Sequence, residues 1–203
     1  MYQKPEKIGE GPESQIEMDN PANRSQQVRV VCGCASPLSP FIGSRAHGLL
    51  FGPMGRWSRD ELEKAFALYL EAGARAGAMG DWSEWPEIFT EDATYIEHHF
   101  GIFHGRDEIR AWITDTMSQF PGNEMDAFPA VWYVIDEERG WVVAEIINRM
   151  KDIGDGQVHQ ATNLTVLKYA GDGLWSSEED VYNPARFIEM IQEWSEAKQK
   201  LSS

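Results

Sequence analysis

Halfway along this sequence the hydrophobic pattern changes from the period of helices to that of strands. Between residues 58 and 78, apolar side chains recur every three or four positions, which is typical of an amphipathic helix. In the second half, four strand-like runs are separated by turn signals at residues 136–140, 154–156 and 171–173. Helices followed by an antiparallel meander predict an α+β fold, in which helices cover one face of a curved sheet.

Four helices are expected. The first spans residues 58–78, because Ser58 is an N-cap followed three residues later by Glu61, and Gly80 ends the helix. The others are predicted at residues 83–89, 107–118 and 184–197. Pro86 is compatible with the second helix because it lies in the first turn, where its missing N–H has no partner to lose.

Residues 1–53 are rich in Pro, Gly, Ser, Gln and Asn and show no sustained helical or strand period. Such a segment buries too little apolar surface to offset the entropy lost on ordering, so we predict a disordered N-terminal tail. We expect the functional chain to begin near Met54, the preceding residues being dispensable or an over-long start. One domain then covers residues 54–203, which is long enough to bury a sizeable core.

The charge balance narrows the class of partner. The chain has 33 acidic and 18 basic side chains and a net charge of −15, which argues against nucleic acid and anionic membranes. No apolar run approaches the roughly 20 residues of a membrane helix, and the N-terminus lacks a basic segment followed by an apolar stretch. Cys32 and Cys34 indicate incidental thiols in a reduced compartment. We therefore expect a cytoplasmic protein without nucleic-acid or membrane partners.

A short polar strand between two predicted helices carries a carboxylate and two imidazoles. Because side chains alternate along a strand, Tyr95, Glu97 and His99 share one face, while Ile96 and His98 share the other. Adjacent histidines on opposite faces cannot chelate one ion without a bulge, so we predict no metal site. Alternation alone does not say which face looks into a cavity. A satisfied polar pair on an exposed strand end is the structural alternative for Glu97 and His99.

Short motifs surround this strand: Gly-Asp-Trp at residues 80–82, Phe-Thr-Glu-Asp-Ala at 89–93, and Gly-Arg at 105–106 opening a helix. Together they resemble the NTF2-like superfamily, in particular its SnoaL-like branch, over roughly residues 57–197. The resemblance implies an NTF2-like cone, with three N-terminal helices packed in the concave face of a curved antiparallel sheet. It also implies a homodimer that pairs through the convex face of the sheet.

Aligned without gaps through the polar strand, the resemblance places Glu97 where the superfamily's ketosteroid isomerases keep their catalytic base. It therefore implies that Tyr95, Glu97 and His99 face inward, with Glu97 as base and His99 as an orienting group or partner acid. Desolvation moves the proton affinity of a carboxylate toward the range useful near neutral pH. The same alignment puts Gly73 and Thr165 where those isomerases hold an oxyanion-hole tyrosine and aspartate, so ketosteroid isomerase activity is not expected.

Carried through the last turn, the resemblance places a second polar group on the pocket side. This group comprises Glu178, Asp180 and Tyr182 from one strand and Asn163 and Thr165 from the strand before it. SnoaL-like cyclases and epoxide hydrolases use an acidic residue from this region, which makes Asp180 the second catalytic candidate. Buried carboxylates are costly unless each finds a partner, a water or a ligand. A sheet end open to solvent is the alternative.

The remaining candidates are expected to form the wall of a pocket. Large aromatic side chains are interpreted first as core and second as an apolar wall for a ring-shaped ligand, and Tyr69 or Tyr95 can supply a phenol. Candidate catalytic residues are Glu97, His99, Asp180 and Tyr95. Candidate substrate-binding residues are Tyr69, Trp82, Trp85, Trp132, Asn148, Asn163, Thr165, Glu178 and Tyr182.

These features predict an enzyme that acts without a cofactor, by proton transfer, on a small apolar or polycyclic molecule. Isomerase, dehydratase and cyclase chemistry all fit such a residue set. The sequence contains no phosphate loop and no dinucleotide glycine fingerprint. One alternative is a non-catalytic module that binds a hydrophobic ligand or a protein partner in the same cavity. Another is a purely structural subunit, if Trp82, Trp132 and Met150 fill that cavity.

Overall fold

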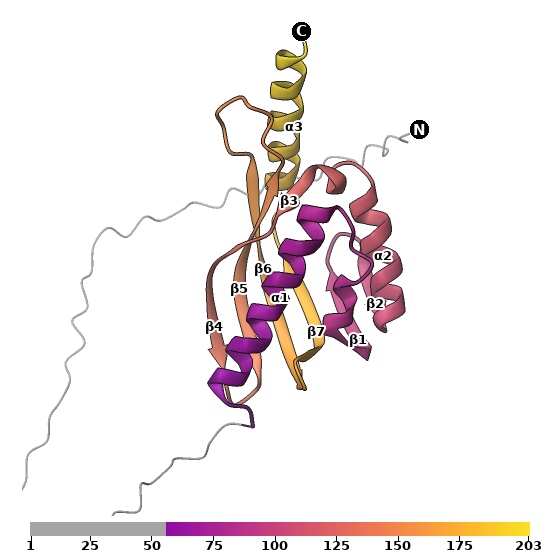
Figure 1. Ribbon diagram of the computed structural model, residues 1–203, viewed down its shortest axis with the longest axis vertical. Helices are drawn as coiled ribbons and strands as arrows, with labels where there is room; N and C mark the ends of the chain where they lie inside the picture. Colours follow the sequence, from indigo (N-terminus) through magenta and orange to yellow (C-terminus); the bar gives the residue numbers. More distant parts are fainter. Residues whose placement is uncertain (1–55) are drawn as a thin grey trace, which may run out of the picture. The chain divides into compact units, whose positions relative to one another are not determined.

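The structure, a computed structural model, describes residues 56–203 (Figure 1). The α-helices of this range are α1 (Arg59–Met79), α2 (Arg106–Ser118) and α3 (Pro184–Leu201), and the 3-10 helices are η1 (Trp85–Ile88) and η2 (Gly122–Glu124). The strands are β1 (Phe89–Glu97), β2 (Gly101–His104), β3 (Met125–Ala127), β4 (Ala130–Asp136), β5 (Trp141–Met150), β6 (Gln160–Gly171) and β7 (Leu174–Val181). The predictions made for residues 1–53 lie outside the described residues.

Helix α1 begins and ends where its sequence signals predict. The Ser58 side chain accepts a hydrogen bond from the Glu61 backbone N–H at 3.2 Å, and Gly80 ends the helix in a left-handed conformation with a φ of 66°. Gly77 lies so close to the chain around β3 that a Cβ there would come within 2.8 Å of the Asp126 carbonyl oxygen. The packing of α1 against this strand therefore requires glycine at position 77.

The helix predicted at residues 83–89 is wrong, because this segment forms only the single 3-10 turn η1. Pro86 has no N–H to donate, and the chain becomes β1 at Phe89, which pairs with Trp175 of β7. The predictions of α2 and α3 are confirmed, and α3 continues about one turn further than expected, to Leu201. The N-terminal layer thus contains two α-helices and a 3-10 turn in place of three helices.

The strands form one mixed sheet with the order β2-β1-β7-β6-β5-β3, and β4 also pairs with β5. Strands β4 to β7 follow one another as an antiparallel meander, as predicted. β1 instead runs parallel to β7, so the expectation of a purely antiparallel sheet is wrong at this point. The sheet is curved and α1 lies across one of its faces (Figure 1). The combination of helices with a curved open sheet confirms the α+β class.

The main core lies between α1 and the inward face of the sheet. Val142 and Ala144 of β5 and Leu167 of β6 are completely buried in one cluster with Leu62 and Phe66 of α1. None of the helices in residues 56–203 is long and apolar enough to cross a membrane.

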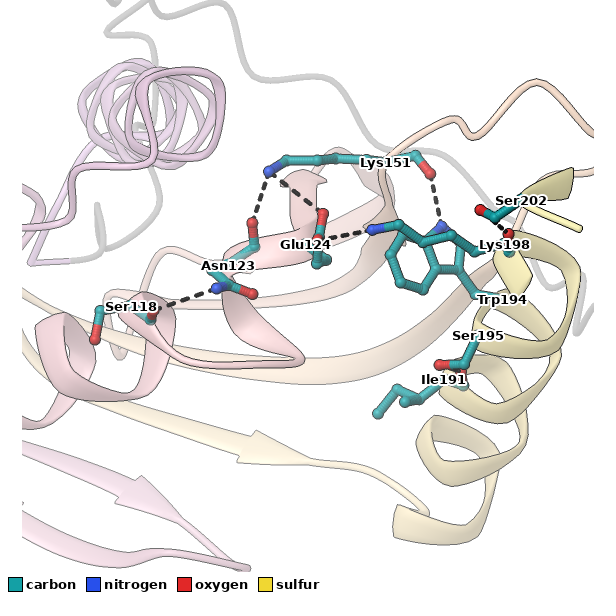
Figure 2. A network of polar contacts seen from close by, with 9 residues as sticks. All are labelled: Ser118, Asn123, Glu124, Lys151, Ile191, Trp194, Ser195, Lys198 and Ser202. Carbon is teal, nitrogen blue, oxygen red and sulfur yellow. Dashed lines mark hydrogen bonds and ion pairs between the residues drawn. The ribbon is translucent and has the colours of Figure 1, made fainter.

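Helix α3 packs on the sheet in a second, smaller apolar cluster, in which Met190 and Trp194 are almost completely buried. Trp194 Nε1 donates a hydrogen bond to the Lys151 carbonyl oxygen at 2.8 Å (Figure 2). Lys198 Nζ donates to a Glu124 carboxylate oxygen at 2.9 Å, and Lys151 Nζ lies 3.6 Å from the other oxygen of that carboxylate. Helix α3 is therefore held to the rest of the domain by apolar burial and by the ion cluster of Lys198, Glu124 and Lys151.

We expect apolar burial to dominate this attachment. Trp194→Ala should lower the free energy of unfolding by about 3 kcal/mol or more, because it removes a large buried ring. Lys198→Ala should lower it by about 1 kcal/mol or less, because its ion pair is partly exposed to solvent. Urea unfolding followed by circular dichroism measures both values. Equal losses in the two variants would contradict the assignment.

Candidate active site

The inward face of the sheet carries one cluster of polar side chains beside the main core. The parallel register of β1 and β7 places Tyr95 opposite Glu178 and Glu97 opposite Asp180. The antiparallel register of β6 and β7 places Thr165 opposite the same Asp180. Because side chains alternate along each strand, all five of these residues point to one face. Three strands thus bring together groups that are far apart in the sequence.

Asp180 lies at the centre of this cluster. Its Oδ1 accepts hydrogen bonds from Asn163 Nδ2 and from Thr165 Oγ1, each at 2.6 Å. Its Oδ2 accepts a hydrogen bond from Tyr95 Oη at 2.5 Å. Asn148 belongs to the same network, because its Nδ2 donates to Asn163 Oδ1 at 2.7 Å. The carboxylate of Asp180 is therefore held by neutral donors, which bring five of the predicted site residues into one network.

Glu178 is the most deeply buried carboxyl group of the cluster and is 1 % exposed. Its Oε1 accepts a hydrogen bond from Tyr69 Oη at 2.7 Å and lies 3.4 Å from Tyr95 Oη. Its Oε2 is buried and has no hydrogen-bond partner among the described residues. An unpaired buried carboxylate oxygen is costly, so this atom is suited to carry the proton of a neutral carboxyl group or to meet a ligand.

Burial separates the acidities of these two carboxyl groups. Desolvation raises the pKa of Asp180 to about 6, against the hydrogen bonds just described, and the negative charge of Glu97 adds to the rise. Desolvation, together with the charge of Asp180, raises the pKa of Glu178 well above its ordinary value. Desolvation and the nearby carboxylates also raise the pKa of Tyr69 and Tyr95. Burial therefore favours the neutral form of Glu178 and of the two phenols more strongly than that of Asp180, whose pKa of about 6 leaves it mostly ionised at neutral pH.

Glu97 lies inside the cluster, on the face that the resemblance implied, and it is 4 % exposed. Its Oε2 accepts hydrogen bonds from the backbone N–H groups of His99 at 2.9 Å and Phe100 at 2.6 Å. The inward position predicted for the His99 side chain is wrong, because β1 ends at Glu97 and the next three residues form a turn. The imidazole of His99 is exposed, and His99 contacts the site residues through its backbone.

The histidines of this region give no metal centre. His98 faces outward, where its Nε2 lies 2.9 Å from Glu179 Oε1, and the His104 backbone N–H donates to Glu108 at 2.7 Å. Within residues 56–203 no group of three or more His, Cys, Asp and Glu side chains is arranged to hold a metal ion.

Aromatic side chains form one side of the cluster. The Trp85 ring is 5 % exposed and its centroid lies 6.2 Å from the ring centroids of both Tyr69 and Tyr95. The Trp82 ring lies 5.7 Å from that of Trp85 and belongs to the buried core. Of this predicted pair, Trp85 therefore contacts the site and Trp82 supports it from the core.

The predicted position of Trp132 in the pocket wall is wrong. The pairing of β4 with β5 shifts register between Ala130 and Trp132, so that Tyr133 and Ile135 face inward and Trp132 faces outward. The Tyr133 ring lies 4.9 Å from that of Phe66 in α1, whereas Trp132 is 45 % exposed on the other side of the sheet.

Tyr182 lies at the edge of the cluster, after the last residue of β7. Its ring is 4.7 Å from that of Phe187 in α3, so the first turn of α3 borders the site. Partial burial raises the pKa of the Tyr182 phenol, and its proximity to Glu97 adds to the rise. Tyr182 therefore remains a hydrogen-bond donor at neutral pH.

Trp112 and Phe103 contact the site although the sequence analysis did not select them. The Trp112 ring of α2 lies 4.8 Å from that of Tyr95 and stacks on Phe103 of β2 at 4.6 Å. Trp112 Nε1 is buried and has no hydrogen-bond partner within the described range. The helical spacing of Trp112 with Ile109 and Ile113 marks an apolar face, and nothing in that spacing indicates contact with Tyr95.

Comparisons with known proteins agree with this architecture. A model of the SnoaL-like domain matches residues 70–178. A proposed isomerase from Bacillus subtilis has a similar structure, with a TM-score of 0.52 and 18 % identity over 64 % of this chain and 95 % of that chain. A proposed SnoaL-like polyketide cyclase from Jannaschia sp. CCS1 has a TM-score of 0.51 and 16 % identity over 69 % of this chain and 94 % of that chain. These structural likenesses show the fold alone, and no curated protein matches the sequence.

The raised pKa of Asp180 predicts how stability depends on pH. Folding raises this pKa from an ordinary value of 3.8 to about 6, so the associated stability is present below about pH 4 and is lost as the pH rises through about 6. The loss is at most about 3 kcal/mol, at about 1.4 kcal/mol per pKa unit.

Asp180→Asn removes this titration while keeping a side chain of similar shape. The variant should therefore become more stable relative to wild type as the pH rises from about 4 to about 7.5. Urea unfolding at both pH values gives the two differences in free energy. A difference that does not change with pH would contradict the raised pKa.

Proposed function

The chain belongs to the family of SnoaL-like domains within the NTF2-like superfamily, and we propose that it is a small-molecule enzyme acting by cofactor-independent proton transfer. The proposed substrate is a small apolar or polycyclic molecule, and the reaction is an isomerisation, a dehydration or a cyclisation. One observation supports this above all: Asp180 and Glu178 lie in one hydrogen-bonded cluster with Tyr69 and Tyr95, where burial raises the pKa of both carboxyl groups. Carboxyl groups whose acidities are separated by their environment are typical of acid/base sites.

Asp180 is the base in this proposal. A pKa of about 6 leaves it ionised at neutral pH and still basic enough to take a proton. When it removes a proton from a carbon next to a carbonyl group, the electron pair of the C–H bond enters an enolate. The neutral Glu178 carboxyl or the Tyr95 hydroxyl is a suitable donor to the enolate oxygen.

The three reactions differ in what happens to the enolate. Return of the proton to another carbon gives an isomer. Departure of a hydroxyl group, protonated as water, gives a dehydrated product. Attack of the enolate carbon on a second carbonyl group closes a ring. The same base and donors serve each of these paths, so the residues alone leave the reaction open among them.

Glu97 is the second candidate for the base in this proposal. The resemblance to ketosteroid isomerases implies that role for Glu97. Its Oε2 already accepts two backbone N–H groups of the turn after β1. We therefore assign Glu97 a supporting part, in which its negative charge raises the pKa of Asp180. The rival proposal is a non-catalytic module that binds a hydrophobic ligand or a protein partner between the aromatic rings and the polar cluster.

Incubation of the full chain with a cell extract, followed by untargeted metabolite profiling, tests the enzyme proposal. Wild type should consume at least one compound, and Asp180→Asn should slow that consumption by roughly 10²-fold or more, because a general base contributes about this much. Glu97→Gln should have a smaller effect. The wild-type kcat/KM should rise with pH through about 6 as Asp180 ionises.

Glu179→Gln is the matched control, because Glu179 lies between the two site carboxyls in the sequence but faces outward and pairs with His98. Its turnover should equal that of wild type. Turnover that survives in Asp180→Asn but is lost in Glu97→Gln would move the role of base to Glu97. A compound that all variants retain and none consumes would favour the binding module.

We also propose that two copies pair through the outward face of the sheet. The strand registers align Trp132, Glu145, Leu164 and Val181 in one row across the sheet. A neighbouring row contains Val134, Val143, Val166, Glu179, Ile96 and Ile102. Trp132, Val134, Leu164, Val181 and Ile102 are between 40 % and 56 % exposed. Two mainly apolar rows, each with one glutamate, lie on one exposed face and are suited to a second copy of that face, as in an isologous dimer.

Leu164→Lys places a charge within this face and should weaken the dimer at least about tenfold, which corresponds to about 1.4 kcal/mol. Sedimentation velocity over a concentration series measures the change. Ile188→Lys is the control, because Ile188 is also a large aliphatic residue and is 54 % exposed, compared with 40 % for Leu164, but lies on α3. A monomeric wild type, or equal effects of the two substitutions, would contradict the proposed face.

A further inference from the structure

Two asparagines on neighbouring strands connect the cluster to β5. In the antiparallel register of β5 and β6, Asn163 lies opposite Ile146 and Asn148 lies opposite Ala161, so the two asparagines are diagonal neighbours. Asn148 Nδ2 donates a hydrogen bond to Asn163 Oδ1 at 2.7 Å. In this contact, the Oδ1 atom of the Asn163 amide points toward Asn148.

The nitrogen end of the same amide faces the base. Asn163 Nδ2 donates to Asp180 Oδ1 at 2.6 Å and to Thr165 Oγ1 at 2.8 Å, and both acceptors lie on the same side of its amino group. Because the Thr165 hydroxyl oxygen accepts from Asn163, its single proton is free to point at Asp180 Oδ1, 2.6 Å away. One orientation of the Asn163 amide therefore supplies two donors to Asp180.

The reversed orientation would destroy this arrangement. It would place Asn163 Oδ1 against the Asp180 carboxylate and the Asn163 amino group against the amino group of Asn148. Thr165 would lose the donor that orients its hydroxyl. The contact with Asp180 would become repulsive, and the Asn148 amide would have to turn as well to keep its hydrogen bond with Asn163, so Asp180 and Asn148 both favour the observed orientation.

We propose that Asn148 is a positioning residue that holds the Asn163 amide in the orientation that keeps two hydrogen-bond donors on the base. We call the chain of hydrogen bonds from Asn148 through Asn163 to Thr165 and Asp180 the relay. Its importance for catalysis rests on the proposed function, in which Asp180 is the base. The orientation itself can be measured without any substrate. Donors on a carboxylate favour its charged form and oppose the effect of burial. Without the relay, Asp180 would be protonated over more of the neutral range and would be available as a base less often.

Other ionisable groups also affect the pKa of Asp180. The ionisable groups that interact with Asp180 or share its cluster are Glu97, Glu178, Tyr69, Tyr95 and Tyr182. Burial and the charge of Glu97 raise the pKa of Asp180, whereas hydrogen bonds from Thr165, Tyr95 and Asn163 lower it. The donors to Asp180 in this network are hydroxyl and amide groups, so the amide orientation is a large part of what stabilises its charge.

Carbon-13 NMR titration of the Asp180 carboxyl group in the full chain tests the relay. Asn148→Ala should raise the pKa of Asp180 by about half a unit to one unit, because the Asn163 amide loses its anchor. Asn148→Ser keeps a hydroxyl donor and should restore part of the wild-type value. Asn148→Asp should give the largest rise, because a carboxylate there attracts the Asn163 amino group and turns the amide oxygen toward Asp180.

The Asn163→Ala background separates the relay from simple charge effects. In that background Asn148→Ala should leave the pKa of Asp180 unchanged, and the rise caused by Asn148→Asp should shrink. Thr162→Asp is the matched control, because it adds a charge on the exposed side of the neighbouring position on β6. Equal shifts with and without the Asn163 amide, or no shift in Asn148→Ala, would overturn the relay.

Turnover distinguishes failure of the relay from failure of the proposed function. An enzyme that loses turnover in Asp180→Asn but shows no pKa shift in Asn148→Ala has its base as proposed and lacks the relay. A protein that shows the pKa shifts but consumes no compound has the relay and is not the proposed enzyme. In an active enzyme with the relay, the pH profile of kcat/KM in Asn148→Ala should move upward by the same amount as the Asp180 pKa.

Discussion

The parallel pairing of β1 with β7 is the contact on which the site depends. β1 joins the antiparallel meander through β7 alone in the strand order, and its other neighbour is the short β2. This pairing sets Tyr95 opposite Glu178 and Glu97 opposite Asp180. A slip of β7 by one residue would turn both of its site carboxyls outward and bring Glu179 inward. The apolar core resists such a slip, because it would also expose the side chains buried beneath α1. Packing therefore enforces the register that the polar cluster needs.

The cluster brings together two buried carboxyl groups, Glu97 and Glu178, and the partly buried Asp180, and its structure limits how many of them carry charge. Burying one ionised carboxylate costs several kcal/mol, whereas a hydrogen bond to a charged group contributes about 1.5–3 kcal/mol. Asp180 accepts three such bonds and remains ionised at neutral pH. A full charge on Glu178 would add repulsion from Asp180 to its own desolvation, and both effects raise the pKa of Glu178 and favour its neutral form. The negative charge on Asp180, which neutral donors stabilise, therefore makes a negative charge on Glu178 more costly.

The parts of the fold encoded by local signals could be predicted from the sequence, and the parts set by distant pairing could not. The cap at Ser58 and the turn glycines of the meander act over a few residues, so α1 and the strands from β4 to β7 follow from them. Strand alternation also placed Asn163, Glu178 and Asp180 on one face. It failed for His99, where β1 ends, and the interpretation of Trp132 as an aromatic pocket wall failed because a bulge turns this residue to the outer face. Neither the parallel partner of β1 nor the bulge has a signal within its own segment.

Glu97, Glu178 and Asp180 are equivalent at the level of the sequence, where alternation and the family resemblance together imply that each of them faces inward. Their hydrogen-bond partners make them different. Glu97 directs one oxygen at two backbone N–H groups and so stabilises the turn after β1. Glu178 lies against Tyr69 with a second oxygen that lacks a partner among the described residues, which suits a neutral acid. Asp180 is held by three donors that keep it charged against its burial. The assignment of the base therefore depends on the hydrogen bonds that each carboxyl accepts, which become visible once the strands are paired.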